Sequence, residues 1–205
     1  MMVATAIHCV LLDLGKVLLD VEPREFGKRM RSLTGLEEWQ LHRIFLEDDI
    51  VERYETGRIS DVEFHAEVCS RAGVAIEKRS FDEAWNSVIG KRPLVSQKVL
   101  ASLSARVPLW ILSNTNKIHF DFISARHAFL RYFRGYILSH EVGLLKPDAG
   151  IFEHALRKTA SQPSETLFVD DQIANVEAAR RMGIDAFQFL DADQFQRELT
   201  LRGLL

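Results

Sequence analysis

The pattern of hydrophobic and polar positions predicts strands that alternate with helices over most of the chain. Residues 7–12 form a short apolar run that is typical of a strand buried on both faces. After Pro93, which the pattern places at the first position of a helix, the alternation is regular. The expected later elements are strands at 108–113, 135–139, 166–170 and 185–189, and helices at 117–130, 149–158, 176–182 and ending at 199. Short connections between such elements indicate a parallel sheet covered by helices on both faces.

A purely helical block, from about 23 to 89, interrupts this alternation after the first strand. Two S-x-x-E sequences, at Ser60 and Ser80, match the capping box in which serine and glutamate satisfy backbone donors at a helix start. Glycines at 35, 57 and 73 fall between the expected helices. The block therefore predicts a helical cap over residues 20–90, inserted into an α/β core formed by 1–19 and 91–205.

Composition fits an ordinary globular protein and excludes some partners. The 205 residues are 47% hydrophobic and 27% charged, and a chain of this size buries roughly 70% of its unfolded surface. The formal net charge of -3 offers no bulk attraction to nucleic acid or to an anionic membrane. Any phosphate must therefore be held by a local site.

The cysteines and the N-terminal segment predict a cytoplasmic protein. Cys9 and Cys69 stand in no metal-binding or redox spacing, so both are expected to be reduced structural thiols. The start of the chain has no signal-peptide pattern, and about 18 consecutive apolar residues occur nowhere. We expect neither a membrane nor a nucleic-acid partner, and a monomer or weak homodimer.

Polar residues follow several of the predicted strands and should meet at one edge of the sheet, where α/β proteins bind ligands. They are Asp13, Ser113, Asn114, Lys146, Asp170 and Asp171. Each has an ordinary structural explanation as a turn residue, a helix cap or a solvated loop lysine. Their conjunction favours chemistry, because paired carboxylates repel unless a cation compensates them.

The same set of groups suits phosphoryl transfer. Carboxylates with a backbone carbonyl and a phosphate oxygen satisfy Mg²⁺. A carboxylate can attack phosphorus to form an aspartyl-phosphate. A serine hydroxyl, backbone N–H groups and a lysine can position the phosphoryl oxygens and neutralise their charge.

Four motifs in order resemble the haloacid dehalogenase superfamily of phosphohydrolases. They are "LLDLGKVL", "ILSNTN", Lys146-Pro147 and "FVDDQIANVEAA". The likeness covers essentially the whole chain and implies a Rossmann-like α/β core with an inserted helical type-one cap. By position, it implies that Asp13 is the nucleophile, that Ser113 and the Asn114 N–H hold the phosphoryl group, and that Lys146 screens it from Asp13.

The resemblance also implies a Mg²⁺ site. Asp13 and Asp171 would be direct ligands, Asp170 their partner, and Gly15 would supply its main-chain carbonyl. Asn175 is expected either to support this shell or to be a helix-surface amide.

Gly15 departs from the usual pattern of the superfamily, in which a second aspartate acts as acid and base. Such help is worth about 10² to 10⁴ in rate. Three consequences of the glycine compete. The leaving group needs little protonation; a water or another group, such as Lys16, His119 or a cap residue, replaces the aspartate; or catalysis is lost and the protein only binds phosphate. The sequence is similar to the "DLGNV" subgroup, which includes α-D-glucose-1-phosphate phosphatases and has glycine here, although Lys16 stands where that subgroup commonly has asparagine.

The cap is expected to set substrate choice by closing over the site. Polar cap residues that could face sugar hydroxyls are Glu52, Arg53, Glu55 and Arg58. His119, near the start of a helix beside the site, is the favoured further substrate contact.

We therefore predict a Mg²⁺-dependent phosphatase for a small phosphomonoester, a sugar phosphate such as glucose 1-phosphate, acting through an aspartyl-phosphate. Three alternatives stay open. A metal-free 2-haloacid dehalogenase would have no use for the Asp170-Asp171 pair, and a phosphomutase would more usually need the missing aspartate. A non-catalytic phosphate-binding module would fit Gly15.

Overall fold

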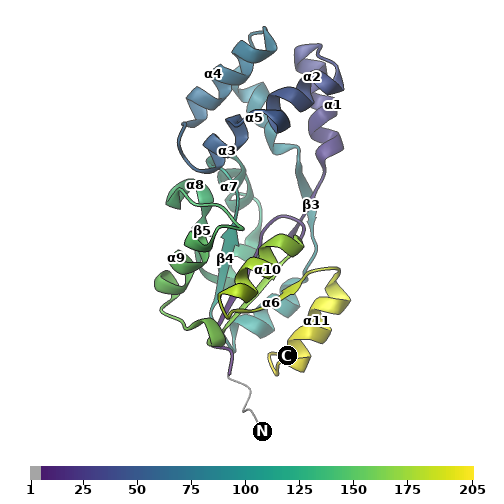
Figure 1. Cartoon of the computed structure of the whole chain (residues 1–205). Helices are drawn as coiled ribbons and strands as arrows, with labels where there is room; N and C mark the ends of the chain where they lie inside the picture. Colours follow the sequence, from purple (N-terminus) through teal and green to yellow (C-terminus); the bar gives the residue numbers. More distant parts are fainter. Residues whose placement is uncertain (1–5) are drawn as a thin grey trace.

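The core is a five-stranded parallel sheet, seen in a computed structural model that describes residues 6–205 (Figure 1). The strand order is β5-β4-β1-β6-β7. The strands are β1 (Cys9–Leu12), β4 (Leu109–Ser113), β5 (Phe133–Leu138), β6 (Thr166–Asp170) and β7 (Asp185–Gln188). The predicted α/β class with a parallel sheet is confirmed.

The register of the central strands places their polar ends at one edge. Leu12 of β1 is opposite Ile111 of β4 and Val169 of β6. Since parallel strands run in the same direction, the next residue of each strand lies at nearly the same level. Asp13 is therefore level with Asp170.

Both faces of the sheet are covered, as the apolar strand pattern predicted. Val10 and Leu12 point into one hydrophobic cluster, and Cys9 and Leu11 into another. The first cluster includes residues of α6 (Gln97–Ser104) and α11 (Ala192–Leu201), and the second residues of α9 (Ala149–Thr159) and α10 (Ile173–Arg181). Burying each large apolar side chain contributes about 1.5–3 kcal/mol, so β1 is held from both sides.

The helical block forms a cap with a hydrophobic cluster of its own (Figure 1). Its elements are α1 (Pro23–Thr34), α2 (Glu38–His42), a π-helical turn (Arg43–Glu47), α3 (Ile50–Glu55), α4 (Asp61–Ala72) and α5 (Lys78–Asn86). Two antiparallel strands that the sequence did not predict, β2 (Leu19–Val21) and β3 (Ile89–Pro93), join cap and core. The boundaries at 19/20 and 90/91 stay a prediction. No helix within residues 6–205 is long and apolar enough to cross a membrane.

One of the two predicted capping boxes is correct. The Ser60 hydroxyl accepts the Glu63 N–H, and the Glu63 carboxylate accepts the Ser60 N–H at 2.8 Å. The box at Ser80 is wrong, because Glu77 caps α5 and its carboxylate accepts the N–H groups of Arg79 and Ser80. Because Glu77 caps the helix one turn before Ser80, Ser80 lies inside the helix and not at its start.

Two predicted helix boundaries are also wrong. Pro93 is opposite Leu19 in the β2–β3 ribbon, and α6 begins later, with Ser96 accepting the Val99 N–H. The helix expected over 117–130 ends early: α7 (Lys117–Ser124) is followed by a separate 3-10 turn (Ala128–Tyr132). The apolar residues that prolonged the helical pattern pack into the core from that turn.

Gly57 is required where the cap meets the core, and its replacement should be costly. Its φ is +67°, and an added Cβ would lie 2.3 Å from the carbonyl oxygen of His140. We expect Gly57→Ala to cost more than the roughly 1–2 kcal/mol of a left-handed backbone alone. Gly35→Ala is the matched control, because Gly35 has φ +70° with open space around it. Urea unfolding followed by circular dichroism compares them, and an equal loss would contradict the clash.

Candidate active site

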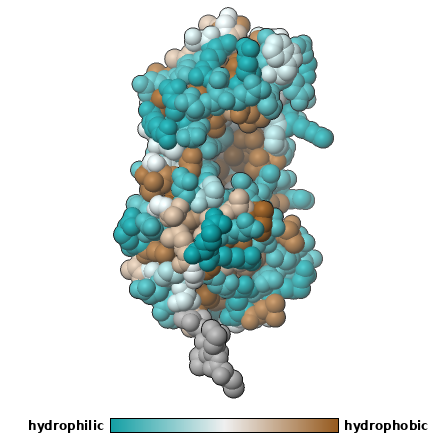
Figure 2. Space-filling model, in the orientation of Figure 1, coloured by the Kyte–Doolittle hydropathy of each residue, from teal (hydrophilic) through white to brown (hydrophobic). Residues whose placement is uncertain are grey.

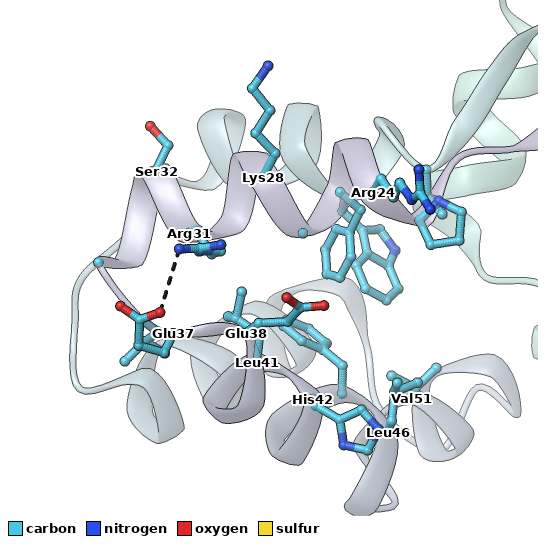
Figure 3. Close-up of a pocket in the computed structure, with 18 of the residues that line it drawn as sticks. Arg24, Lys28, Arg31, Ser32, Glu37, Glu38, Leu41, His42, Leu46 and Val51 are labelled. Atoms are coloured by element: carbon cyan, nitrogen blue, oxygen red, sulfur yellow. Dashed lines mark ion pairs between the residues drawn. The ribbon is translucent and has the colours of Figure 1, made fainter.

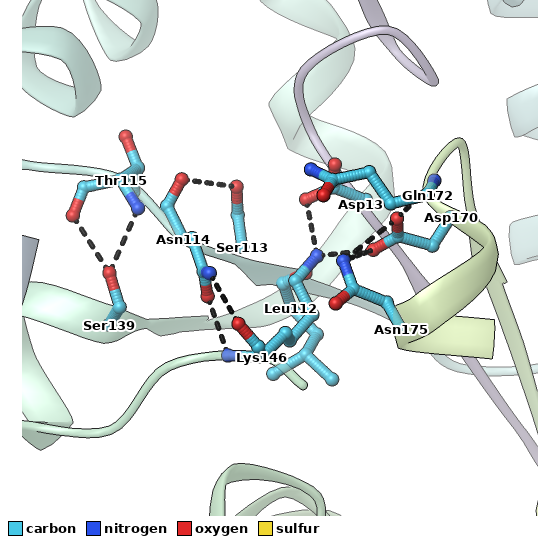
Figure 4. A network of polar contacts seen from close by, with 10 residues as sticks. All are labelled: Asp13, Leu112, Ser113, Asn114, Thr115, Ser139, Lys146, Asp170, Gln172 and Asn175. Atoms are coloured by element: carbon cyan, nitrogen blue, oxygen red, sulfur yellow. Dashed lines mark hydrogen bonds and ion pairs between the residues drawn. The ribbon is translucent and has the colours of Figure 1, made fainter. Parts of the chain in front are cut away.

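A buried ion network occupies the carboxyl edge of the sheet (Figure 4). The Lys146 ammonium donates to Asp13 Oδ1 at 2.7 Å, to Asp170 Oδ2 at 2.6 Å and to the Leu112 carbonyl at 2.9 Å. The three charged side chains are at most 10% exposed. One cation therefore compensates two carboxylates away from water.

Burial and mutual charge shift the pKa values of this network. Burial raises the pKa of Asp13 to about 6, Lys146 opposes the shift, and the negative charge of Asp170 adds to it. Burial by itself would lower the pKa of Lys146, but Asp13 and Asp170 outweigh it and raise that pKa. Lys146 therefore stays protonated, and any further positive charge at the site favours ionised Asp13.

The Asn114 side chain fixes the loop that carries Lys146 (Figure 4). Its amide donates to the Lys146 carbonyl at 2.9 Å and accepts the Lys146 N–H at 2.8 Å. This double contact joins the end of β4 to a loop 32 residues away in sequence. The sequence predicted a role for the backbone N–H of Asn114. Its side chain has a further one, because it positions the backbone of Lys146.

Asp170 is held by α10. The Asn175 amide contacts both carboxylate oxygens of Asp170 at 3.0 Å, and the Gln172 N–H donates to Oδ1 at 2.8 Å. Asn175 is buried, so the alternative of a helix-surface amide is wrong. These donors and Lys146 saturate Asp170 and fix its orientation.

Three carboxylates converge here as a cation site would require. Asp13, Asp170 and Asp171 each offer an oxygen, and these oxygens lie within 4.8 Å of one another. Burial and the charge of Asp170 raise the pKa of Asp171, as expected for a carboxylate without full compensation. Hard oxygen donors with excess negative charge fit Mg²⁺. The metal roles of Asp171, Asp170 and the Gly15 carbonyl stay predictions.

Lys16 lies at the rim of this cluster. Its ammonium is 3.9 Å from Asp171 Oδ2, and its side chain is 59% exposed. An ion pair with that much solvent contributes little to stability. Lys16 therefore adds positive potential near Asp171 and is not part of the buried network.

The carboxyl end of β4 adds hydroxyl groups and backbone donors to the site (Figure 4). The Ser113 hydroxyl is buried, and its one hydrogen bond within residues 6–205 is a long contact of 3.4 Å to the Asn114 carbonyl. Ser139, at the start of α8 (Ser139–Val142), accepts the Thr115 N–H and donates to the Thr115 carbonyl, both at 2.9 Å. The sequence did not indicate Ser139, whose role depends on strand pairing. The arrangement leaves the Ser113 hydroxyl able to bind an anion.

His119 fastens the cap to the core. Its ring stacks on Trp85 with centroids 4.9 Å apart, Nε2 donates to the Trp85 carbonyl at 3.1 Å, and Nδ1 accepts from Asn116 at 3.1 Å. Burial lowers the pKa of His119 to about 4, so the ring is neutral. The ring lines the cap cavity, but both nitrogens are engaged in this junction. Its predicted contact with substrate stays untested.

Comparisons with known proteins find relatives of this chain in sequence and in fold. The family model for haloacid dehalogenase-like hydrolases matches residues 7–183. A D-ribitol-5-phosphate phosphatase from Bacteroides thetaiotaomicron is 25% identical over 94% of this chain and 96% of its own. A HAD family enzyme of the same organism, solved with magnesium and inorganic phosphate, superposes with a TM-score of 0.84 at 27% identity, covering 91% and 96% of the two chains. A sesquiterpene phosphatase from Aspergillus oryzae is 23% identical over 92% of each.

Removing the central cation should destabilise the fold. Lys146→Met leaves Asp13 and Asp170 buried without compensation, which costs roughly 3–5 kcal/mol at neutral pH. Lys98→Met on the exposed face of α6 is the control, with a change within about 0.5 kcal/mol. Urea unfolding measures both, and similar stability of the two variants would contradict the importance of the network.

Proposed function

We propose, since the chain belongs to the haloacid dehalogenase-like hydrolase family, that it is a Mg²⁺-dependent phosphatase acting on small-molecule phosphomonoesters through an aspartyl-phosphate. The observation that carries the proposal is Asp13 held by the Lys146 ammonium beside two further carboxylates. A carboxylate fixed in this way is an oriented nucleophile. The relatives named as phosphatases support the same reaction class.

The residues divide the work by position. A carboxylate oxygen of Asp13 attacks phosphorus, and the P–O bond to the alcohol breaks. The Ser113 hydroxyl, the Asn114 N–H and the Lys146 ammonium hold the phosphoryl oxygens. Asp13 and Asp171, with Asp170 as their partner, would hold Mg²⁺, which would supply further positive charge for those oxygens. Water then attacks phosphorus and releases Asp13 and inorganic phosphate.

A sugar or sugar-alcohol phosphate is the proposed substrate. The relative named for D-ribitol 5-phosphate supports this class. Glucose 1-phosphate belongs in the same set, because its anomeric oxygen leaves more easily than a simple alcohol and Gly15 provides no acid.

A second candidate is the phosphate ester of an apolar alcohol, which the cap cavity favours. The cavity measures about 980 Å³ and lies between α1 and α2 (Figure 3). Leu41, Leu46 and Val51 line it together with Phe26, Phe45 and Trp85. Figure 2 shows apolar atoms in the hollow between cap and core. The sesquiterpene phosphatase relative supports this class.

The alternatives fit the site less well. In a metal-free dehalogenase, Asp171 beside Asp13 and Asp170 would add uncompensated negative charge. A binding module has no need of an aspartate so closely oriented by Lys146.

Hydrolysis of p-nitrophenyl phosphate tests the reaction class. We expect turnover with Mg²⁺, loss of it with chelator, and at least a 10³-fold loss in Asp13→Asn, because the amide is not a nucleophile. Asp193→Asn on the exposed surface of α11 is the matched control. Chelator-insensitive release of chloride from chloroacetate would favour the dehalogenase instead, and wild-type activity no higher than Asp13→Asn would contradict the phosphatase.

A substrate panel then separates the two substrate classes. We expect kcat/KM for D-ribitol 5-phosphate or glucose 1-phosphate to exceed that for farnesyl phosphate if sugar phosphates are the substrates. The reverse order would show that the apolar cavity wall selects the alcohol.

A further inference from the structure

The cap places one carboxylate, Glu55, beside the catalytic edge of the core. Glu55 is the last residue of α3, and the residues on either side of it contact the core. The preceding residue, Tyr54, accepts the Ile118 N–H of α7 on its hydroxyl at 3.3 Å. Two residues later, the Gly57 backbone abuts the His140 carbonyl of α8. Glu55 is therefore held at the cap–core junction between two anchored positions.

Glu55 lies where the wall of the cap cavity meets the core. Glu55 lines the cap cavity together with His119 and Trp85. Burial, and next the negative charge of Asp13, raise the pKa of Glu55 to about 7, while Lys146 opposes the shift. His140, against which Gly57 packs, contacts the Thr115 carbonyl through its ring at 3.1 Å, and Thr115 follows shortly after Ser113. The end of α3 that carries Glu55 therefore lies over the carboxyl edge of the sheet.

The other ionisable groups around Glu55 are already engaged or stand elsewhere in the cavity. Neutral His119 uses both ring nitrogens in the junction with α5. The remaining ionisable residues of the cavity wall stand on or beside α1 and α2, as Figure 3 shows: Arg24, Lys28, Arg31, Glu37, Glu38 and His42. Asp13 and Lys146 are the charges that act on the Glu55 carboxyl from the core.

We propose that Glu55 is the general acid and the general base of the phosphatase reaction, a role that the backbone at Gly15 cannot fill. The inference rests on the proposed phosphatase function and on the position of Glu55 in the cavity wall, at the cap–core junction over the carboxyl edge of the sheet. A group near its own pKa at working pH can both donate and accept a proton efficiently.

The two half-reactions balance with Glu55 returning to its starting state. In the first, an Asp13 oxygen bonds to phosphorus, the P–O bond to the alcohol breaks, and the leaving oxygen takes the bond's electron pair and the Glu55 proton. The products are free alcohol, aspartyl-phosphate and the Glu55 carboxylate. In the second, the Glu55 carboxylate takes a proton from water as the water oxygen bonds to phosphorus. The bond between phosphorus and Asp13 breaks, which restores the Asp13 carboxylate and releases inorganic phosphate.

Glu55→Gln tests this role, with Glu83→Gln as the matched control. Glu83 is a cap glutamate of α5, 60% exposed and paired with Arg79, so its change should leave activity within about twofold. For Glu55→Gln we expect kcat with D-ribitol 5-phosphate, or with the best ester of the substrate panel, to fall by about 10² to 10⁴. The decline of kcat/KM as the pH rises above about 7, where Glu55 loses the proton that it donates, should disappear with it.

Rapid mixing gives a second readout. p-Nitrophenolate leaves without protonation, so Glu55→Gln should release one equivalent of it in a burst and then turn over slowly, because water attack lacks its base. Wild-type enzyme should show no such burst. A Glu55→Gln variant whose kcat is within threefold of wild type, with an unchanged pH profile and no burst, would overturn the proposal while leaving the phosphatase function intact. Absence of wild-type turnover over the whole panel would overturn both.

A compensating change separates chemistry from folding. A Cβ at Gly15 would meet the nearest atom, Cγ2 of Val21, at 3.4 Å, so an aspartate there fits the backbone. Adding Gly15→Asp to Glu55→Gln should raise kcat at least tenfold above that of Glu55→Gln alone and should remove the burst. If a folded double variant of wild-type stability recovers nothing, Glu55 serves substrate binding and its acid–base role is overturned.

Discussion

The whole site depends on one buried ammonium. Lys146 lies between Asp13 and Asp170 and is the cation that makes two carboxylates tolerable at the edge of an apolar sheet. Separating any of these charges from its partner would leave it desolvated, which costs several kcal/mol. Neighbouring residues therefore hold these charged groups in place. The Asn114 side chain binds the backbone of Lys146, and the Asn175 amide orients the Asp170 carboxylate.

A second constraint is the attachment of the cap. Trp85 stacks on His119 and donates to Asn116, so an aromatic side chain of the cap shares a polar contact with the first turn of α7. Together with the Tyr54 contact, this brings the cavity of the cap toward the carboxyl edge of the core. On the proposed function, the core carries the nucleophile and the phosphoryl contacts, and the cap contributes the cavity for the alcohol. On our proposal, the cap also supplies through Glu55 the proton transfer that Gly15 cannot provide.

The sequence predicted the parts of the site that depend on strand order. Asp13 follows β1, and Ser113 and Asp170 are the last residues of β4 and β6. The carboxyl ends of parallel strands meet at one edge, so strand order alone predicted that these residues converge. Asn175 and Ser139 were less accessible to prediction, because an amide on a helix or a serine after a strand gains its role only from tertiary contacts. Glu55 appeared as one of several polar cap residues, and it is distinguished only by its place in the cavity wall at the cap–core junction, which depends on tertiary contacts.

The helix start predicted at Pro93 was wrong for a related reason. Pro93 suited a helix start by its fixed φ, yet the pairing of β3 with β2, which stand at opposite ends of the cap sequence, decides its conformation. Such long-range pairing leaves no periodic signal in five residues. The helical content of the cap, in contrast, follows from local pattern and was predicted.

Chemical trapping of the covalent intermediate tests the central claim most directly. Enzyme turning over a phosphomonoester with Mg²⁺ would be acid-quenched, reduced with borohydride and digested for mass spectrometry. The account predicts that the side chain of Asp13 alone is converted to that of homoserine, since borohydride reduces acyl phosphates and spares free carboxylates. An unmodified Asp13 in enzyme that is releasing phosphate, or reduction at another carboxylate, would contradict it.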